Sequence, residues 1–153
     1  MVLRTFRDYR DLPEDIRGGA VAIGNFDGVH QGHWAVIGEA GRLGRDLSIP
    51  FGVLTFEPHP RSVFQPDYPP FRLTPFHSKA IQIEKLDASF LVAAPFDRDF
   101  ASISAEDFVR DVLVKSLGVR QVVVGYDFVF GRGRTGNHEL LARMSNDGGY
   151  GLT

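Results

Sequence analysis

The stretch VAIGNFDGVHQGH, residues 21–33, indicates the kind of fold that this chain adopts. It begins with a short apolar run, which is typical of a buried strand, and continues into a glycine-containing loop with an aspartate and two histidines. Apolar residues at helical spacing follow over residues 33–47, where glycines at 38, 41 and 44 weaken the helix and allow close packing on a sheet. The order of strand, loop and helix predicts a unit in which helices connect parallel strands.

The rest of the chain repeats this alternation. Further strands are expected over residues 51–56, 89–94 and 119–125, further helices over 74–86, 104–117 and 137–144, and a loop over 61–73. Three helix starts carry N-terminal signals: Thr74 before a proline, Ser104 three residues before an aspartate, and Asn137. The alternation predicts an α/β fold with a mostly parallel sheet and helices on both faces.

Length and composition narrow the class of protein. With 153 residues, 43% hydrophobic content and a net charge of −2, the chain suits one globular domain. The charge balance lacks the basic excess of nucleic-acid binders, and no apolar stretch suits a membrane span or a signal peptide. The absence of cysteine excludes disulfides, thiolate zinc sites and cysteine nucleophiles. We expect a cytoplasmic protein whose partners are small molecules, not nucleic acid or membrane.

The loop after residues 21–23 is expected at the carboxyl edge of the sheet, where open α/β folds bind ligands. If the next helix begins at the end of this loop, its unpaired N–H groups form an anion site. His30 and His33 would lie on one helix face and could both reach a phosphate, while Gly24 and Gly28 would let the backbone approach it. The loop therefore predicts phosphate binding.

Other interpretations of the two histidines were weighed. They could form ordinary exposed surface, or bind zinc with His59 or Asp27 as a third ligand, although the His-Glu-x-x-His spacing of metalloproteases is absent. The chain has neither the G-x-S-x-G elbow of serine hydrolases nor a Walker P-loop. Phosphate binding by the loop remains the favoured interpretation.

Residues 131–136, GRGRTG, match the G-x-G-x-x-G pattern of dinucleotide-binding folds. The pattern should directly follow a strand, whereas five residues separate it from Gly125. We interpret it as a mobile basic loop, in which Arg132 and Arg134 are either solvated or close over phosphates.

Five blocks then carry a resemblance to a known family. They are GNFDGVHQGH at 24–33, TFEPHPR at 55–61, RLT at 72–74 with Lys79 downstream, AEDF at 105–108, and VGYDFVFGRGRTG at 124–136. The first resembles the HxGH signature of the nucleotidylyltransferase superfamily. Together, across about residues 17–145, the blocks resemble the FMN adenylyltransferase module of prokaryotic bifunctional FAD synthetases. The resemblance implies a Rossmann-like nucleotidylyltransferase fold.

The resemblance also implies an activity, the transfer of AMP from ATP to FMN with Mg²⁺, which gives FAD and pyrophosphate. His30 and His33 are then the expected catalytic residues. The expected ATP-binding residues are Gly24, Asn25, Phe26, Asp27, Gly28, His30, Gly32 and His33. Asp27 either shapes the turn, which we favour, or helps hold the metal.

The flavin side of the expected cleft comes from the later blocks. Its expected residues are Phe56, Pro58, His59, Arg61, Arg72, Asp127, Phe128 and Phe130. The phenylalanines can stack on the flavin ring, although core packing is the commoner role of any one of them. Arg61 and Arg72 are candidates for the FMN phosphate, or are surface charges.

The family pattern also extends past this chain. Its second nucleotide motif, the strand that leads to it, and the riboflavin kinase domain are expected after residue 153, so residues 1–153 are interpreted as a truncated FMN adenylyltransferase domain with weak activity alone. The full protein would also use riboflavin. Two alternatives are an HxGH nucleotidylyltransferase for another phosphorylated substrate and a non-catalytic flavin- or nucleotide-binding module.

Overall fold

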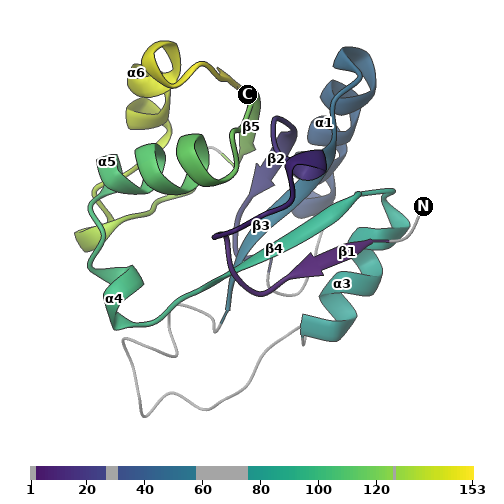
Figure 1. The fold of residues 1–153 in the computed structure, drawn as a ribbon, viewed down its shortest axis with the longest axis horizontal. Coiled ribbons are helices and arrows are strands. Elements are labelled where there is room, and N and C mark those ends of the chain that lie inside the picture. Colours follow the sequence, from purple (N-terminus) through teal and green to yellow (C-terminus); the bar gives the residue numbers. More distant parts are fainter. Residues whose placement is uncertain (1–2, 27–30, 58–75, 126) are drawn as a thin grey trace.

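The computed structural model describes residues 3–26, 31–57, 76–125 and 127–153. Its centre is a six-stranded sheet in the order β1-β4-β3-β2-β5-β6, in which every neighbouring pair is parallel (Figure 1). The strands are β1 (Arg4–Phe6), β2 (Ala20–Ile23), β3 (Phe51–Glu57), β4 (Phe90–Pro95), β5 (Gln121–Val124) and β6 (Gly151–Leu152). The helices are α1 (Gln31–Leu47), α3 (Phe76–Lys85), α4 (Arg98–Ala101), α5 (Ala105–Asp107), the π-helix η2 (Phe108–Ser116) and α6 (His138–Gly148), with short 3₁₀ turns at η1 (Glu14–Ile16) and η3 (Arg132–Arg134). The predicted α/β class with a parallel sheet is confirmed.

The four predicted strands are confirmed as β2 to β5, and the predicted helix starts at two caps are confirmed as well. The side chain of Ser104 accepts a hydrogen bond from the amide of Asp107 at 3.1 Å, and that of Asn137 accepts one from Leu140 at 3.0 Å. The start signal at Thr74 and the loop over 61–73 lie outside the described residues.

Several elements differ from the prediction. Strand β1 and the short helices η1, α4 and η3 are not predicted from the sequence, and a strand beyond the last helix is expected only after residue 153, whereas β6 pairs with β5 within the chain. The helix from Ser104 also changes character after its first turn, since η2 is a π-helix, in which the amide of Leu117 reaches back five residues to the carbonyl of Val112 at 3.0 Å.

Helices cover both faces of the sheet, as predicted. One core layer packs α1 and α3 on the sheet through Ala22, Val53, Leu91, Ile37 and Ile83. The other packs η2 and α6 on the opposite face, through alternate strand residues such as Val21, Ile23 and Leu54 together with Val112 and Leu141. In Figure 1, α1 and α3 lie at the right and α5 and α6 at the left.

The glycines of α1 do not share one role. Cβ atoms at Gly41 and Gly44 would lie 3.1 Å and 2.9 Å from the side chain of Phe51, so these two glycines permit the predicted close approach of α1 to β3. A Cβ at Gly38 would meet nothing within 4 Å. Only the first two are needed for packing.

The position of β2 in the sheet indicates where a ligand site is expected. It lies between β3 and β5, and the chain reaches β3 through α1 on one face but arrives at β5 from η2 on the other. The strand order therefore reverses at β2, and open α/β sheets bind ligands outside the carboxyl ends of the strands at such a point. The turn that follows β2 lies there.

Candidate functional site

The turn at residues 24–26 leaves β2 through a constrained backbone. The amide of Gly24 donates to the carbonyl of Leu54 at 3.2 Å, and Phe26 has a φ of 50°, which is unusual for a residue other than glycine. The ring of Phe26 folds back over Gly24, where a Cβ would lie 3.1 Å from it. A glycine at 24 therefore lets the ring of Phe26 pack closely on the turn, while the approach of this backbone to a ligand stays a prediction.

Phe26 also positions His33. Its ring is 3% exposed, and it meets the imidazole edge to face, with 5.2 Å between the ring centroids and 89° between the planes. His33 is half-buried in the first turn of α1, which begins at Gln31. Because the ring of Phe26 is buried, a nucleotide contact from this residue would come from its backbone, as predicted.

The carbonyl of Asn25 is held by two donors. It accepts hydrogen bonds from Thr55 Oγ1 at 3.0 Å and from Lys79 Nζ at 2.8 Å. The Asn25 side-chain oxygen Oδ1 is buried, and no described residue donates a hydrogen bond to it. A buried acceptor requires a donor, so this amide is suited to meet a ligand group.

Sequence reasoning missed the location of Lys79, which it noted only within a motif block. The side chain is 1% exposed, and its Nζ also lies 3.4 Å from Thr55 Oγ1 and 3.6 Å from Glu57 Oε1. The available signal was helical spacing, since Lys79 precedes Ile83 of α3 by four residues and Leu86, just past the end of α3, by seven.

The predicted flavin side contains a continuous cluster of aromatic rings. Phe128 stacks on Phe56, with centroids 6.5 Å apart and planes at 14°, and on Phe130, at 5.5 Å and 19°. Phe56 and Phe130 are 6% and 7% exposed and belong to the core, whereas Phe128 is only half-buried. Of these three rings, Phe128 is the most exposed.

Asp127 lies at the same edge as the turn after β2. Its side chain is exposed, and its carboxylate folds over Gly125 at the end of β5, where a Cβ would be 3.2 Å from Oδ1. The amide of Phe128 donates to the carbonyl of Gly125 at 3.1 Å and closes the turn. The structure therefore places Asp127 and Phe128 after β5, next to the strand that leads into residues 24–26.

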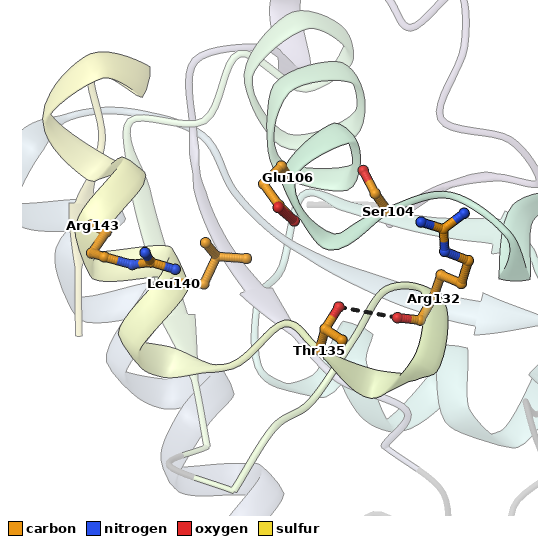
Figure 2. A pocket seen from close by; sticks show the side chains of 6 residues that line it. All are labelled: Ser104, Glu106, Arg132, Thr135, Leu140 and Arg143. Atoms are coloured by element: carbon orange, nitrogen blue, oxygen red, sulfur yellow. Dashed lines mark hydrogen bonds between the residues drawn. The ribbon is translucent and has the colours of Figure 1, made fainter.

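The GRGRTG loop is fixed against α5. Phe130 and Gly136 pair as an antiparallel bridge, and a Cβ at Gly131 would collide with the backbone of Ala105. Arg132 lines a pocket of about 310 Å³ whose other walls are Ser104, Glu106, Thr135, Leu140 and Arg143. Figure 2 shows Arg132 and Arg143 on opposite sides of it, with Thr135 Oγ1 donating to the carbonyl of Arg132 at 3.0 Å.

This pocket is separate from the turn after β2, since none of its lining residues comes from β2, β3 or α1. Arg134 is exposed in η3 with a φ of 56°. The described structure thus does not bring Arg132 together with His33, and phosphate binding by the two arginines stays a prediction.

Several predicted site residues lie outside the described part of the chain: Asp27, Gly28, His30, Pro58, His59, Arg61 and Arg72. Gly32 belongs to the first turn of α1. Among residues 3–26, 31–57, 76–125 and 127–153, no three histidine, aspartate or glutamate side chains form a group that could hold a metal ion. In the same ranges, no helix is long and apolar enough to cross a bilayer.

Comparisons with known proteins give a consistent result. The family model described as FAD synthetase matches residues 12–153. The chain is 36% identical over 152 residues to a bifunctional riboflavin kinase/FMN adenylyltransferase of Escherichia coli K12, covering 99% of this chain and 48% of that protein. A protein of the same name from Haemophilus influenzae is 38% identical over 148 residues, covering 97% and 48%. The chain thus spans about half the length of the curated relatives it matches.

A solved structure shares the fold. The crystal structure of a macrolide-efflux protein from Streptococcus pneumoniae superimposes with a TM-score of 0.82 over the whole chain and 50% of its own chain. At 22% sequence identity, this likeness concerns the fold alone. It agrees with the Rossmann-like arrangement of the sheet.

Proposed function

Because this chain belongs to the FAD synthetase family, we propose that the protein transfers AMP from ATP to FMN and releases FAD and pyrophosphate. One observation carries the proposal: the glycine turn at residues 24–26 lies where the strand order reverses, and its Phe26 ring packs on His33 at the start of α1. This is the geometry that a polyphosphate requires, with backbone close to the ligand and hydrogen-bond donors directed toward it.

The reaction needs no protein nucleophile. An oxygen of the FMN phosphate attacks the α-phosphorus of ATP, and as the new P–O bond forms, the bond to pyrophosphate breaks. The protein holds the two anions in line and stabilises the charge that develops on the leaving group. We assign these tasks to His33 and to the backbone N–H groups at the start of α1, with His30 as the second predicted donor.

The nucleoside of ATP would lie beside residues 24–26. The unsatisfied Oδ1 of Asn25 needs a donor, and adenosine offers two ribose hydroxyls and an amino group. Gly24 leaves room for the ring of Phe26 to fold back over this turn.

FMN would then occupy the edge after β5. Phe128 is the most exposed ring of the cluster that it forms with Phe56 and Phe130, and we assign it the contact with the isoalloxazine. Asp127, exposed beside it, can accept hydrogen bonds from the flavin.

Magnesium enters this scheme with the nucleotide. The carboxylate of Glu57 lies 3.6 Å from Lys79 Nζ and is 13% exposed, so we do not assign it to the metal. The described residues supply no metal site of their own. Mg²⁺ bound to ATP would neutralise phosphate charge; Asp27, whose favoured role is to shape the turn, is the alternative candidate for a protein ligand.

We further propose that residues 1–153 act as the FMN adenylyltransferase domain of a longer protein that also phosphorylates riboflavin. This proposal is supported by the relatives, whose name combines both activities and of which this chain matches about half the length. We expect this domain alone to form FAD weakly and the longer protein to form it efficiently.

The test is product formation by the full protein. Incubation with ATP, Mg²⁺ and FMN should yield FAD and pyrophosphate in equal amounts, and CTP in place of ATP should yield neither. Transfer from CTP, or to a different phosphorylated acceptor only, would support the alternative nucleotidylyltransferase. Flavin binding without turnover would support a binding module and contradict the proposal.

A further inference from the structure

Lys79 is a charged residue in a position that an apolar side chain could fill. It lies on the face of α3 that packs on the sheet, one turn before Ile83, and the two side chains are 1% and 0% exposed. Removing an ammonium group from water is unfavourable unless polar groups replace the water. The burial of Lys79 therefore indicates that its hydrogen bonds have a specific task.

Those bonds join three segments that are distant in sequence. Lys79 Nζ donates to the carbonyl of Asn25, 54 residues earlier, at 2.8 Å, and it contacts Thr55 Oγ1 at 3.4 Å and Glu57 Oε1 at 3.6 Å. An ammonium has three donors, so it can bind several acceptors at once. Through Lys79, α3 is tied to the end of β3 and to the turn after β2.

The tie acts on the peptide that precedes Phe26. With Thr55 and Lys79 both donating to it, the Asn25 carbonyl has a fixed direction, and this fixes the plane of the peptide that leads into Phe26. Phe26 then takes its left-handed conformation, and its ring meets His33. A change at the Asn25 carbonyl is thus transmitted to the imidazole through one backbone bond and one ring contact.

We propose that Lys79 is a positioning residue for the adenylyl transfer, which holds the turn at residues 24–26 so that His33 meets the phosphates of ATP. The inference rests on the proposed function. We assign Lys79 a role that acts through the turn, because its side chain is 1% exposed and its Nζ lies within 3.6 Å of acceptors on Asn25, Thr55 and Glu57. Thr55 Oγ1 is the second group that donates a hydrogen bond to the Asn25 carbonyl.

The main test is the double variant Lys79→Met with Glu57→Gln in the full protein. Methionine keeps the length and apolar stem, and glutamine avoids leaving a carboxylate buried without its cation. The kcat for FAD formation, corrected for the folded fraction, should fall about 10- to 100-fold, as expected when a catalytic group is misplaced by about 1 Å, while the KM for FMN stays within about twofold.

Ile83→Ala is the matched control, since it opens a cavity on the same face of α3 without touching Asn25. It should lower stability and leave the corrected kcat unchanged. Thr55→Val removes one donor with little change in shape, and it should lower kcat about threefold. If the double variant does not fold, Thr55→Val becomes the test of the proposal. An unchanged kcat in Thr55→Val would then contradict it.

A second readout does not depend on catalysis. In the ligand-free full protein, the double variant should speed amide hydrogen exchange in a peptide that covers residues 22–26, while peptides from β5 keep their protection. If the wild type makes no FAD but exchange responds in this way, the proposed function fails and the positioning of the turn stands. The proposal is overturned if exchange and kcat are unchanged, or if Ile83→Ala lowers the corrected kcat equally.

Discussion

Phe128→Ala should weaken flavin binding as well as the fold. Phe128 is half-buried and makes two stacked ring contacts, with Phe56 and Phe130. Each aromatic pair contributes about 0.5–1.5 kcal/mol beyond burial, so the two lost contacts lower the free energy of unfolding by about 1–3 kcal/mol. Loss of a ring that stacks on a ligand base costs about 1–3 kcal/mol, which raises the Kd for FMN about 5- to 150-fold.

The assay is titration of FMN with the full protein, followed by flavin fluorescence, together with urea unfolding. Phe6→Ala is the matched control, because Phe6 is also half-buried against the same core layer but lies in β1 at the other edge of the sheet. It should lower stability and leave the Kd for FMN unchanged.

Phe130→Ala removes a core ring that packs on Phe128 but is more buried than Phe128. Phe130 is 7% exposed, and truncating a buried phenylalanine lowers the free energy of unfolding by about 3–5 kcal/mol. The reasoning is refuted if Phe128→Ala leaves FMN affinity unchanged, or if Phe6→Ala weakens it to the same extent.

Three further predictions concern stability. Gly52→Ala would place a Cβ under 3.0 Å from the enclosed ring of Phe90, and should lower the free energy of unfolding by about 1–3 kcal/mol. The added Cβ of Gly38→Ala meets open space within α1, so this change should raise the free energy of unfolding by about 0.5–1 kcal/mol. Urea midpoints of the two variants measure these changes, and a stabilising Gly52→Ala would contradict the packing. Burial raises the pKa of Tyr150 from 10.0 to about 12, so the neutral phenol is favoured in the folded state. The stability that Tyr150 contributes is complete below pH 10 and lost between pH 10 and 12; the difference in unfolding free energy between wild type and Tyr150→Phe should shrink over that window, and a constant difference would exclude the effect.

The sequence was informative where local pattern and tertiary structure agree. The apolar runs of β2 to β5 are buried on both faces of a parallel sheet, so composition alone marks them. β1 and β6 have three and two residues and no apolar run. They form because β4 and β5 each have a second edge on which another strand can pair. Such strands depend on a distant partner and leave no local signal.

The π-helix shows a similar limit. Its buried residues Phe108, Val109, Val112 and Leu113 follow a spacing that an α-helix would bury equally well. Widening of the turns depends on packing against the sheet, which the pattern does not encode.

In the candidate site, the place of the turn after β2 could be predicted, because strand, glycine loop and helix follow one another in the chain. The Asn25–Lys79 bond could not, since 54 residues separate its partners. The contact of Phe26 with His33 also depends on the positive φ of Phe26, a conformation that phenylalanine rarely adopts. These contacts either join residues distant in sequence or need an unusual backbone conformation, and neither kind can be predicted from a local sequence pattern.

The most direct measurement is the kcat of FAD formation by the full protein with His33→Ala, beside His138→Ala as a control. His138 is an exposed histidine at the start of α6, where it lines neither the turn after β2 nor the described ring cluster. His33→Ala should lower kcat about 100-fold or more with the fold intact, as loss of a donor to transition-state charge does, and His138→Ala should change it less than about twofold. A His33→Ala protein that forms FAD at the wild-type rate would contradict the account.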